Sequence, residues 1–166
     1  LSVLLSQTQR LHSSVEIGSI SEVRGNAQVL RDKAYGAELQ FDIQQMDDVR
    51  TEAGRVAITF SDDSTVKLTE HSKLVIDEYI YDPDPSKSKM ALKFASGTAR
   101  FITGKFNNKE GISIRTPSAV IAIRGTDFTA TVDELGRSLV ILLPDENGIS
   151  SGEIIVSTGM GSVTLN

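Results

Sequence analysis

The chain has 166 residues, enough for one domain whose hydrophobic core needs neither a metal nor disulfide bonds. Its formal net charge of -5 disfavours binding that depends on neutralising phosphates, so we expect no nucleic-acid partner. Because the chain contains no cysteine, disulfides and thiolate metal sites are excluded. No apolar run approaches the roughly 20 residues that span a bilayer, so no membrane span is predicted.

Residues 1–16 predict an N-terminal extension with an apolar tail. The chain begins with Leu1 rather than Met, which indicates processing or trimming, and no charged and apolar leader pattern opens it. Leu1, Val3 and Leu5 alternate as in a strand, although the apolar spacing also approximates a helix face. We favour an extended segment, followed by a polar linker over residues 7–14.

Beyond this extension the pattern becomes that of β-strands. Apolar residues on both sides of Gly25 predict two short strands that are joined at the glycine. Residues 35–46 are predicted to form a loop anchored by Leu39, Phe41 and Ile43.

The clearest hairpin spans residues 55–68. Apolar and polar residues alternate over residues 55–60, the polar cluster at 61–65 predicts a turn, and the alternation then resumes. The inward positions, which we expect in the core, are Val56, Ile58, Phe60, Val66 and Leu68.

The middle of the chain continues with β-rich segments around a proline break. The run Asp82-Pro83-Asp84-Pro85 must interrupt a sheet, because proline fixes φ and removes a ladder donor. A short basic loop at 86–89 follows it. Strands are predicted at 74–76, 79–81, 91–94, 99–102 and 112–114. The run GKFNNKEG, residues 104–111, is predicted to be a solubilising hairpin loop between two of these strands.

The most informative run is TPSAVIAIRGTDFTATVD, residues 116–133. Its first half has apolar side chains at both parities, which predicts a core strand buried on both faces. After Gly125 a strict alternation of apolar and polar residues begins, as in a strand with one solvent-exposed face. Glycine inside a strand pattern marks a bulge or bend, so Gly125 is predicted to be structural. The core positions predicted in this run are Val120, Ile121, Ile123 and Phe128.

A unit of strand, glycine bend and strand recurs along the chain. It is centred on Gly25, Gly97, Gly125 and Gly159, at unequal spacings that exclude a solenoid of fixed period. Such bends carry short strands from one sheet to the facing sheet. We therefore predict an all-β fold: a compact two-layer or short solenoid-like β-sandwich of many short strands, with an extended N-terminal segment.

These residues resemble the FecR-like domain family, whose members carry a similar Thr-Pro-x-Ala run followed by Arg-Gly-Thr-x-Phe. The resemblance continues upstream through GSISEVRGNAQVL (18–30), DVRTEAGRVAITFSDDSTVKL (48–68) and LKFASGTARFIT (92–103). It covers a β domain at about residues 17–143 and leaves residues 144–166 as a C-terminal β segment. The resemblance implies an all-β extracytoplasmic module without catalytic residues.

Two positions depart from the family pattern. Asp47-Asp48 stands where the family commonly has Gly-Asp, and Asp62-Asp63-Ser64 stands where it has Asp-Gly-Ser. Because Asp tolerates left-handed turns, we expect both departures to be accommodated.

Enzymatic and metal sites have little support. The only histidines are His12 and His71, with no second His or Cys at ligand spacing, so no metal site is predicted. No Gly-x-Ser-x-Gly elbow is present, and adjacent carboxylates such as Asp77 and Glu78 point to opposite faces of a strand. We predict no catalytic residue and no cofactor. The acidic pairs at 62–63 and at 82 and 84 are predicted to form turns.

Arg124 follows an apolar strand, where an unpaired guanidinium is costly to bury. We favour a structural ion pair with Asp127 or Asp48, and a ligand-binding role is the alternative. Phe128 is predicted to be structural as a core residue.

The functional prediction is a non-enzymatic protein–protein interaction or assembly module outside the cytoplasm, in the periplasm, at the cell surface or secreted. An apolar tail is unfavourable in water unless something covers it. If the tail of one copy adds as a strand to the C-terminal sheet edge of the next, a filament follows. The residues predicted to interact are Leu1, Val3, Leu4 and Leu5 on the tail and Val163 and Leu165 at the edge.

The alternative is a periplasmic sensing and signal-transduction domain. The resemblance implies kinship with bacterial regulators that carry iron-uptake signals from an outer-membrane transporter to a sigma factor. A carbohydrate-binding module is disfavoured because it would need exposed aromatic platforms, whereas the chain has no Trp and three Tyr.

Overall fold

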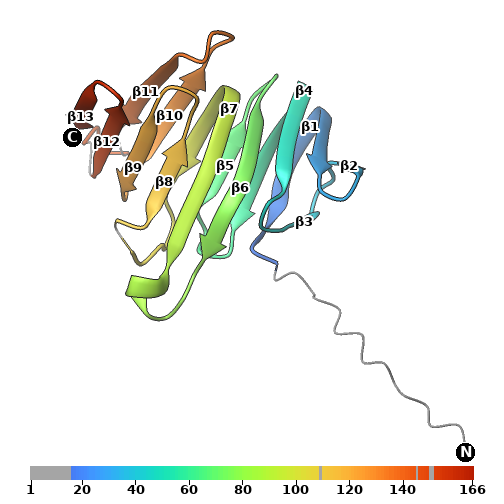
Figure 1. Ribbon diagram of the computed structural model, residues 1–166. Helices are drawn as coiled ribbons and strands as arrows, with labels where there is room; N and C mark the ends of the chain where they lie inside the picture. The colour runs from blue at the N-terminus through green and yellow to red at the C-terminus, as the bar shows by residue number, and fades with distance from the viewer. Residues whose placement is uncertain (1–15, 109, 145, 150–151) are drawn as a thin grey trace, which may run out of the picture.

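The structure, a computed structural model, describes residues 16–108, 110–144, 146–149 and 152–166. Within these ranges thirteen strands form one continuous sheet, and the only helix is the short 3-10 turn η1 (Pro85–Lys87). The prediction of an all-β fold is confirmed. The strands, shown in Figure 1, are β1 (Gly18–Leu30), β2 (Ala34–Gly36), β3 (Asp42–Ile43), β4 (Asp48–Phe60), β5 (Thr65–Leu68), β6 (Lys73–Ile80), β7 (Lys89–Ile102), β8 (Ile112–Arg115), β9 (Val120–Arg124), β10 (Asp127–Val132), β11 (Ser138–Leu143), β12 (Glu153–Thr158) and β13 (Gly161–Leu165).

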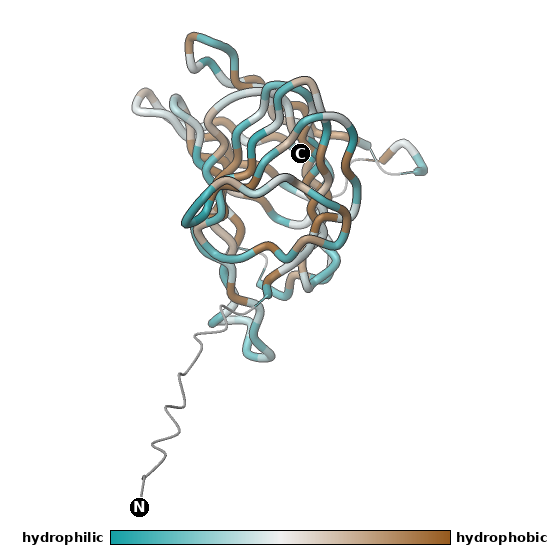
Figure 2. Tube along the Cα trace, turned by 90° about the vertical axis from the view of Figure 1, so that its right-hand side faces the viewer, coloured by the Kyte–Doolittle hydropathy of each residue, from teal (hydrophilic) through white to brown (hydrophobic). Residues whose placement is uncertain are grey.

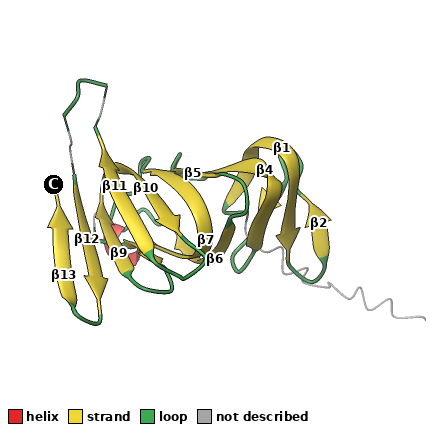
Figure 3. Ribbon diagram, turned by 90° about the horizontal axis from the view of Figure 1, so that it is seen from above, coloured by secondary structure: helices red, strands yellow, loops and turns green. Residues whose placement is uncertain are grey.

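The sheet is folded into two layers because the long strands β1, β4 and β7 each contribute to both. In layer A the order is β2, the end of β1, the start of β4, β6, the start of β7, β8, β9, β12 and β13. In layer B the order is β3, the start of β1, the end of β4, β5, the end of β7, β10 and β11. Figure 3 shows β13 and β12 at one end of the molecule and β1 and β2 at the other.

Glycines mark the line along which the sheet folds. Gly25 on β1 lies opposite Gly54 on β4, Gly97 lies within β7, and Gly125 separates β9 in layer A from β10 in layer B. The predicted transfer between layers is therefore observed at Gly25, Gly97 and Gly125. The prediction is wrong for Gly159, which lies in the hairpin turn between β12 and β13 within one layer.

Hydroxyl side chains bind backbone groups beside this fold line. Thr51 Oγ1 donates to the carbonyl of Thr69 (2.6 Å) and accepts from the amide of Ser72 (2.9 Å). Ser72 Oγ in turn accepts from the amide of Thr98 (3.2 Å). These bonds replace ladder bonds that the bent strands cannot make, which keeps buried backbone groups paired.

The core lies between the two layers, and apolar and polar residues alternate along the strands that enclose it (Figure 2). Phe101 and Phe128 stack near its centre, with ring centroids 4.9 Å apart. Eight of the predicted core residues are buried: Val56, Ile58, Phe60, Val66, Leu68, Ile121, Ile123 and Phe128.

Val120, also predicted to be core, is 38% exposed, and that prediction is wrong. The reason is that β9 alternates: Ile121 and Ile123 face the other layer, whereas Val120 and Arg124 face solvent. The strand is therefore buried on one face, not on both as predicted.

Several loop predictions also need correction. The run 104–111 is not a hairpin loop, because the strands that it connects, β7 and β8, are parallel, and Phe106 within it is buried. Leu39 is exposed and does not anchor its loop, whereas Ile43 is buried as expected. The predicted basic loop at 86–89 largely forms η1, whose first turn is capped by the side chain of Asp84.

Candidate interaction surfaces

The residues predicted to interact fall into two groups. Leu1, Val3, Leu4 and Leu5 lie outside the described residues. Val163 and Leu165 lie on β13, where they pair with Val156 and Ile154 of β12. Leu165 packs against the core, whereas the side chain of Val163 is 63% exposed.

One end of the sandwich is open. Among the described residues β13 pairs only with β12, and β11 pairs only with β10, so each layer ends there in an unpaired strand edge. Figures 1 and 3 place both edges at the same end of the molecule. Unpaired edges present a row of free N–H and C=O groups to a partner strand.

The edge strand β11 is apolar on both faces. Val140 and Leu142 pack against the core and hold the strand in place. Leu139 and Ile141 point the other way and are 58% and 48% exposed. A six-residue edge strand with five apolar residues is a template for pairing with another chain unless it is protected.

The opposite end of the sandwich is closed by short strands and aromatic packing. The outer strands there, β2 and β3, have three and two residues, which leaves little edge for a partner. Tyr35 and Phe41 pack together with ring centroids 5.7 Å apart, and the guanidinium of Arg31 lies over both rings.

A bidentate ion pair supports this closed end. Nε and Nη2 of Arg31 each donate to a carboxylate oxygen of Asp47 at 2.7 Å, and Asp47 is fully buried. The amide of Gln44 donates to the same carboxylate at 2.8 Å. Hydrogen bonding to Asp47 raises the pKa of Arg31 above its ordinary value. Asp47, which stands where the family commonly has glycine, therefore has a structural role.

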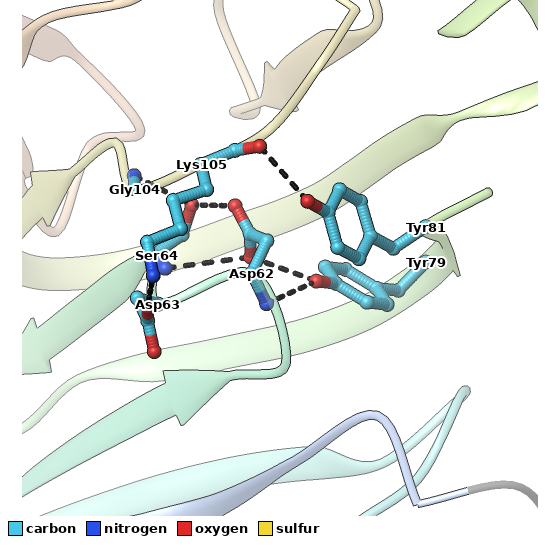
Figure 4. Close-up of polar contacts among 7 residues, drawn as sticks. All are labelled: Asp62, Asp63, Ser64, Tyr79, Tyr81, Gly104 and Lys105. Atoms are coloured by element: carbon cyan, nitrogen blue, oxygen red, sulfur yellow. Dashed lines mark hydrogen bonds and ion pairs between the residues drawn. The ribbon is translucent and has the colours of Figure 1, made fainter. Parts of the chain in front are cut away.

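The second departure lies in a buried polar network, shown in Figure 4. The carboxylate of Asp62 accepts hydrogen bonds from the hydroxyls of Tyr79 (2.7 Å) and Ser64. Ser64 Oγ also accepts from the amide of Gly104 at 2.9 Å. Burial raises the pKa of Tyr79 well above its ordinary value. Both Asp62 and Ser64 are buried, and the network ties the β4–β5 turn to the segment after β7.

The outer part of the network is exposed. The amide of Lys105 donates to the carbonyl of Asp62 at 2.6 Å, and its ammonium pairs with Asp63 at 3.0 Å. Asp63 has φ of 68°, so the left-handed turn expected here is present. Tyr81 donates to the Lys105 carbonyl at 3.2 Å. Because each group already has a partner in the fold, we assign the network to stability, not to chemistry.

Arg124 has different partners from those predicted. Its guanidinium pairs with Glu110 at 3.0 Å and with Glu153 at 3.3 Å, and its side chain is 44% exposed. Asp127 and Asp48 pair with other arginines. The predicted pairs are therefore wrong, because β9 directs Arg124 outward toward β12 and the segment before β8, where the two glutamates lie.

No three His, Asp or Glu side chains converge on a possible metal site among the described residues. A hollow of about 700 Å³ lies beside the fold line and is lined by side chains of both charges, from Arg50, Lys73, Glu38 and Glu52. None of the helical structure described is long and apolar enough to cross a membrane.

Comparison with known proteins agrees with this architecture. The FecR family model, described as FecR protein, matches residues 47–145. A crystal structure from Parabacteroides distasonis, of a protein provisionally assigned as an anti-sigma factor, is similar over 71% of this chain with a TM-score of 0.53 and 15% identity. The chain spans only 50% of that structure, and the likeness shows a shared fold. A search of curated proteins found no match. The family match covers more than half of the sequence, and the chain therefore belongs to the FecR family.

Proposed function

We propose that this chain is a non-enzymatic protein–protein interaction domain of the signalling type that acts outside the cytoplasm. Membership of the FecR family and the fold shared with a protein provisionally assigned as an anti-sigma factor support the signalling role. The observation that carries the proposal is the open edge of β11 with its exposed apolar side chains.

The chemistry of β11 suits addition of a strand from a partner. Free backbone groups along the edge would supply hydrogen bonds, and side chains on alternate positions would supply specificity. Leu139 and Ile141 face solvent on one side, while Val140 and Leu142 hold the strand against the core. A strand held in this way loses little conformational entropy when a partner binds.

A position-dependent cross-link tests this function. The photoreactive residue p-benzoylphenylalanine replaces Ile141 in the full-length protein in its native cells. The matched control replaces Ile80, which is exposed to a similar degree but lies on β6 in layer A. We expect a discrete adduct with another protein from position 141 only, recovered from the extracytoplasmic fraction. Equal adducts at both positions, or an adduct confined to the cytoplasm, would contradict the proposal.

Self-assembly is a second candidate. The described chain begins beside β3, where the amide of Ile17 donates to the carbonyl of Ile43 at 3.1 Å. This place lies away from the β11 and β13 edges (Figure 1), and assembly would join the N-terminal segment of one copy to the edge of another by strand addition. Val163 and Leu165 would then take part in the acceptor edge.

Sedimentation velocity of the whole chain and of a variant lacking residues 1–9 tests self-assembly. Polymers that disappear in a stable truncated monomer support strand addition between copies. A destabilised monomer points to a tail that docks on its own domain, and identical monomers reject both.

A further inference from the structure

The outer face of layer B holds a second hollow, of about 340 Å³, across β1, β4, β5, β7 and β10. Small residues and charged residues both line it. The small ones are Ala57, Thr69, Thr98 and Thr129, and the charged ones are Arg55, Lys67, Arg100 and Glu22. We call this feature the cationic hollow.

Like charges face each other directly across neighbouring strands here. Arg24 on β1 is in register with Arg55 on β4. Lys67 on β5 is in register with Arg100 on β7. Such cross-strand pairs destabilise a sheet, because their side chains are only about 5 Å apart at Cβ. The arrangement therefore opposes stability at two adjacent places on one face.

Carboxylates of this chain neutralise only part of the charge. Asp127 binds Arg100, with Nη2 and Oδ2 2.6 Å apart. Arg24, Arg55 and Lys67 form no ion pair with any described residue, and neither does Glu22, which also lines the hollow. On the outer face of layer A, in contrast, Lys89 and Lys93 pair with Glu78 and Asp77. A β-bulge in β6 places these two carboxylates on one face, so the prediction that they point to opposite faces is wrong. In a chain of net charge -5, unpaired cations concentrated on one face need an explanation.

An apolar strip adjoins the cationic hollow. Thr129, which lines the hollow, is in register with Ile141 of β11, and Thr131 is in register with Leu139. The exposed side chains of Leu139 and Ile141 therefore lie on the same face, two strands from Arg100 and about 10 Å away. The face combines positive charge with exposed apolar surface.

We propose that this face docks an extended acidic segment of a protein partner, with carboxylates in the cationic hollow and apolar side chains over Ile141. Arginine binds carboxylates in a bidentate fork, which suits such a segment. Arg24, Arg55, Lys67 and Arg100 extend over four neighbouring strands, about 14 Å, too far for one small anion to contact them all. This inference rests on the proposed function and names the chemistry of the partner.

Titration of the isotopically labelled 166-residue chain with a synthetic peptide of alternating Glu and Val, followed by NMR, tests the proposal. We expect saturable shifts at backbone amides of β4, β5, β7 and β11. Arg55→Gln with Lys67→Gln should weaken binding about tenfold or more, since each charge-assisted bond is strong. The control, Lys73→Gln with Lys87→Gln, removes the same charge elsewhere and should leave the affinity nearly unchanged.

Four results would overturn the proposal: no binding, equal weakening in the control variant, equal binding of a Lys-Val peptide, or inorganic phosphate binding as tightly at the same amides. The last result would indicate a small-anion site.

The cross-link from position 141 distinguishes failure of this inference from failure of the proposed protein–protein interaction. If that adduct persists unchanged in the Arg55 and Lys67 variant, the edge interaction stands and the acidic segment is rejected. If the peptide binds as expected and no adduct forms, the signalling interaction fails alone.

Discussion

Gly25 on β1 lies directly opposite Gly54 on β4, at the point where both strands leave one layer and enter the other. Gly25 has φ of +66°, and a Cβ there would collide with the carbonyl oxygen of Ala53. A Cβ on Gly54 would lie 2.5 Å from the carbonyl oxygen of Asn26 and 2.6 Å from that of Arg24. The two backbones approach so closely that the strands bend together only without side chains at these positions.

The first prediction is that Gly54→Ala destabilises the protein by at least about 2 kcal/mol, because the atoms that meet the new methyl group belong to the backbone and cannot rotate away. Denaturant melts followed by circular dichroism provide the measurement. Gly36→Ala is the control, since nothing lies within 4 Å of the added Cβ. Equal stability of the two variants would contradict the close approach.

The second prediction concerns Gly125, whose φ is +56° and whose added Cβ would meet no atom within 4 Å. Here the backbone conformation, not a close contact, favours glycine. Gly125→Val should destabilise the fold by about 1 to 2 kcal/mol, because a β-branched residue strongly disfavours the left-handed region. Gly125→Asn should be nearly neutral, since Asn tolerates that region. Thermal melts of both variants decide this, and a stable Val variant would remove the structural role of Gly125.

The third prediction is that Asp47→Ala destabilises the closed end by about 3 kcal/mol, since it leaves the partly buried Arg31 without its carboxylate. Asp48→Ala removes the partner of Arg50 in a pair whose side chains are 24% and 42% exposed, so it should change stability by less than about 1 kcal/mol. Chemical denaturation compares the two. Loss of near-ultraviolet dichroism from Tyr35 and Phe41 in the Asp47 variant alone would place the damage at this end.

The fourth prediction uses the stacked pair at the centre of the core. Phe128→Ala should destabilise the protein by about 3 to 5 kcal/mol, because the side chain is fully buried against Phe101. Val120→Ala, on β9 in the other layer, should cost less than about 1 kcal/mol because Val120 is 38% exposed and faces away from the core. If urea midpoints of the two variants coincide, Phe128 is not a principal core residue.

Periodicity predicted strands best where one face of the strand is buried and the other is exposed to solvent. The alternation of Val56, Ile58 and Phe60 and its resumption at Val66 and Leu68 placed both strands of the β4–β5 hairpin correctly. The pattern failed at Val120, where apolar residues at both parities resembled a strand buried on both faces. An exposed valine on a sheet is energetically tolerable, and no local rule distinguishes it from a buried one.

Long-range pairing determined the features that the sequence did not predict. The partners of Arg124 are set by β9 lying between β8 and β12, and by the segment before β8 that carries Glu110. The cationic hollow likewise arises from register, since Arg24 and Arg55 are 31 positions apart and meet only when β1 pairs with β4. Short-range periodicity contains no information on such contacts.

The final prediction is that Lys67→Gln stabilises the protein, although it removes a charge from a central strand. Lys67 faces Arg100 and has no carboxylate partner among the described residues, so removing its charge relieves repulsion worth a few tenths to about 1 kcal/mol. The Debye length falls to roughly 3 Å at 1 M ionic strength, so salt screens the repulsion between exposed charges. The gain in stability should therefore shrink as the sodium chloride concentration rises. Lys93→Gln is the control: its ammonium has a partner in Asp77 at 3.6 Å, so its removal should bring no gain. Guanidinium chloride is itself a salt, so urea melts at low and high ionic strength are the measurement.

A stabilised variant that binds the acidic peptide more weakly would show that the face sacrifices stability for binding, as functional sites commonly do. Equal or lower stability of Lys67→Gln at low salt would mean that the two cations do not repel each other as their register indicates.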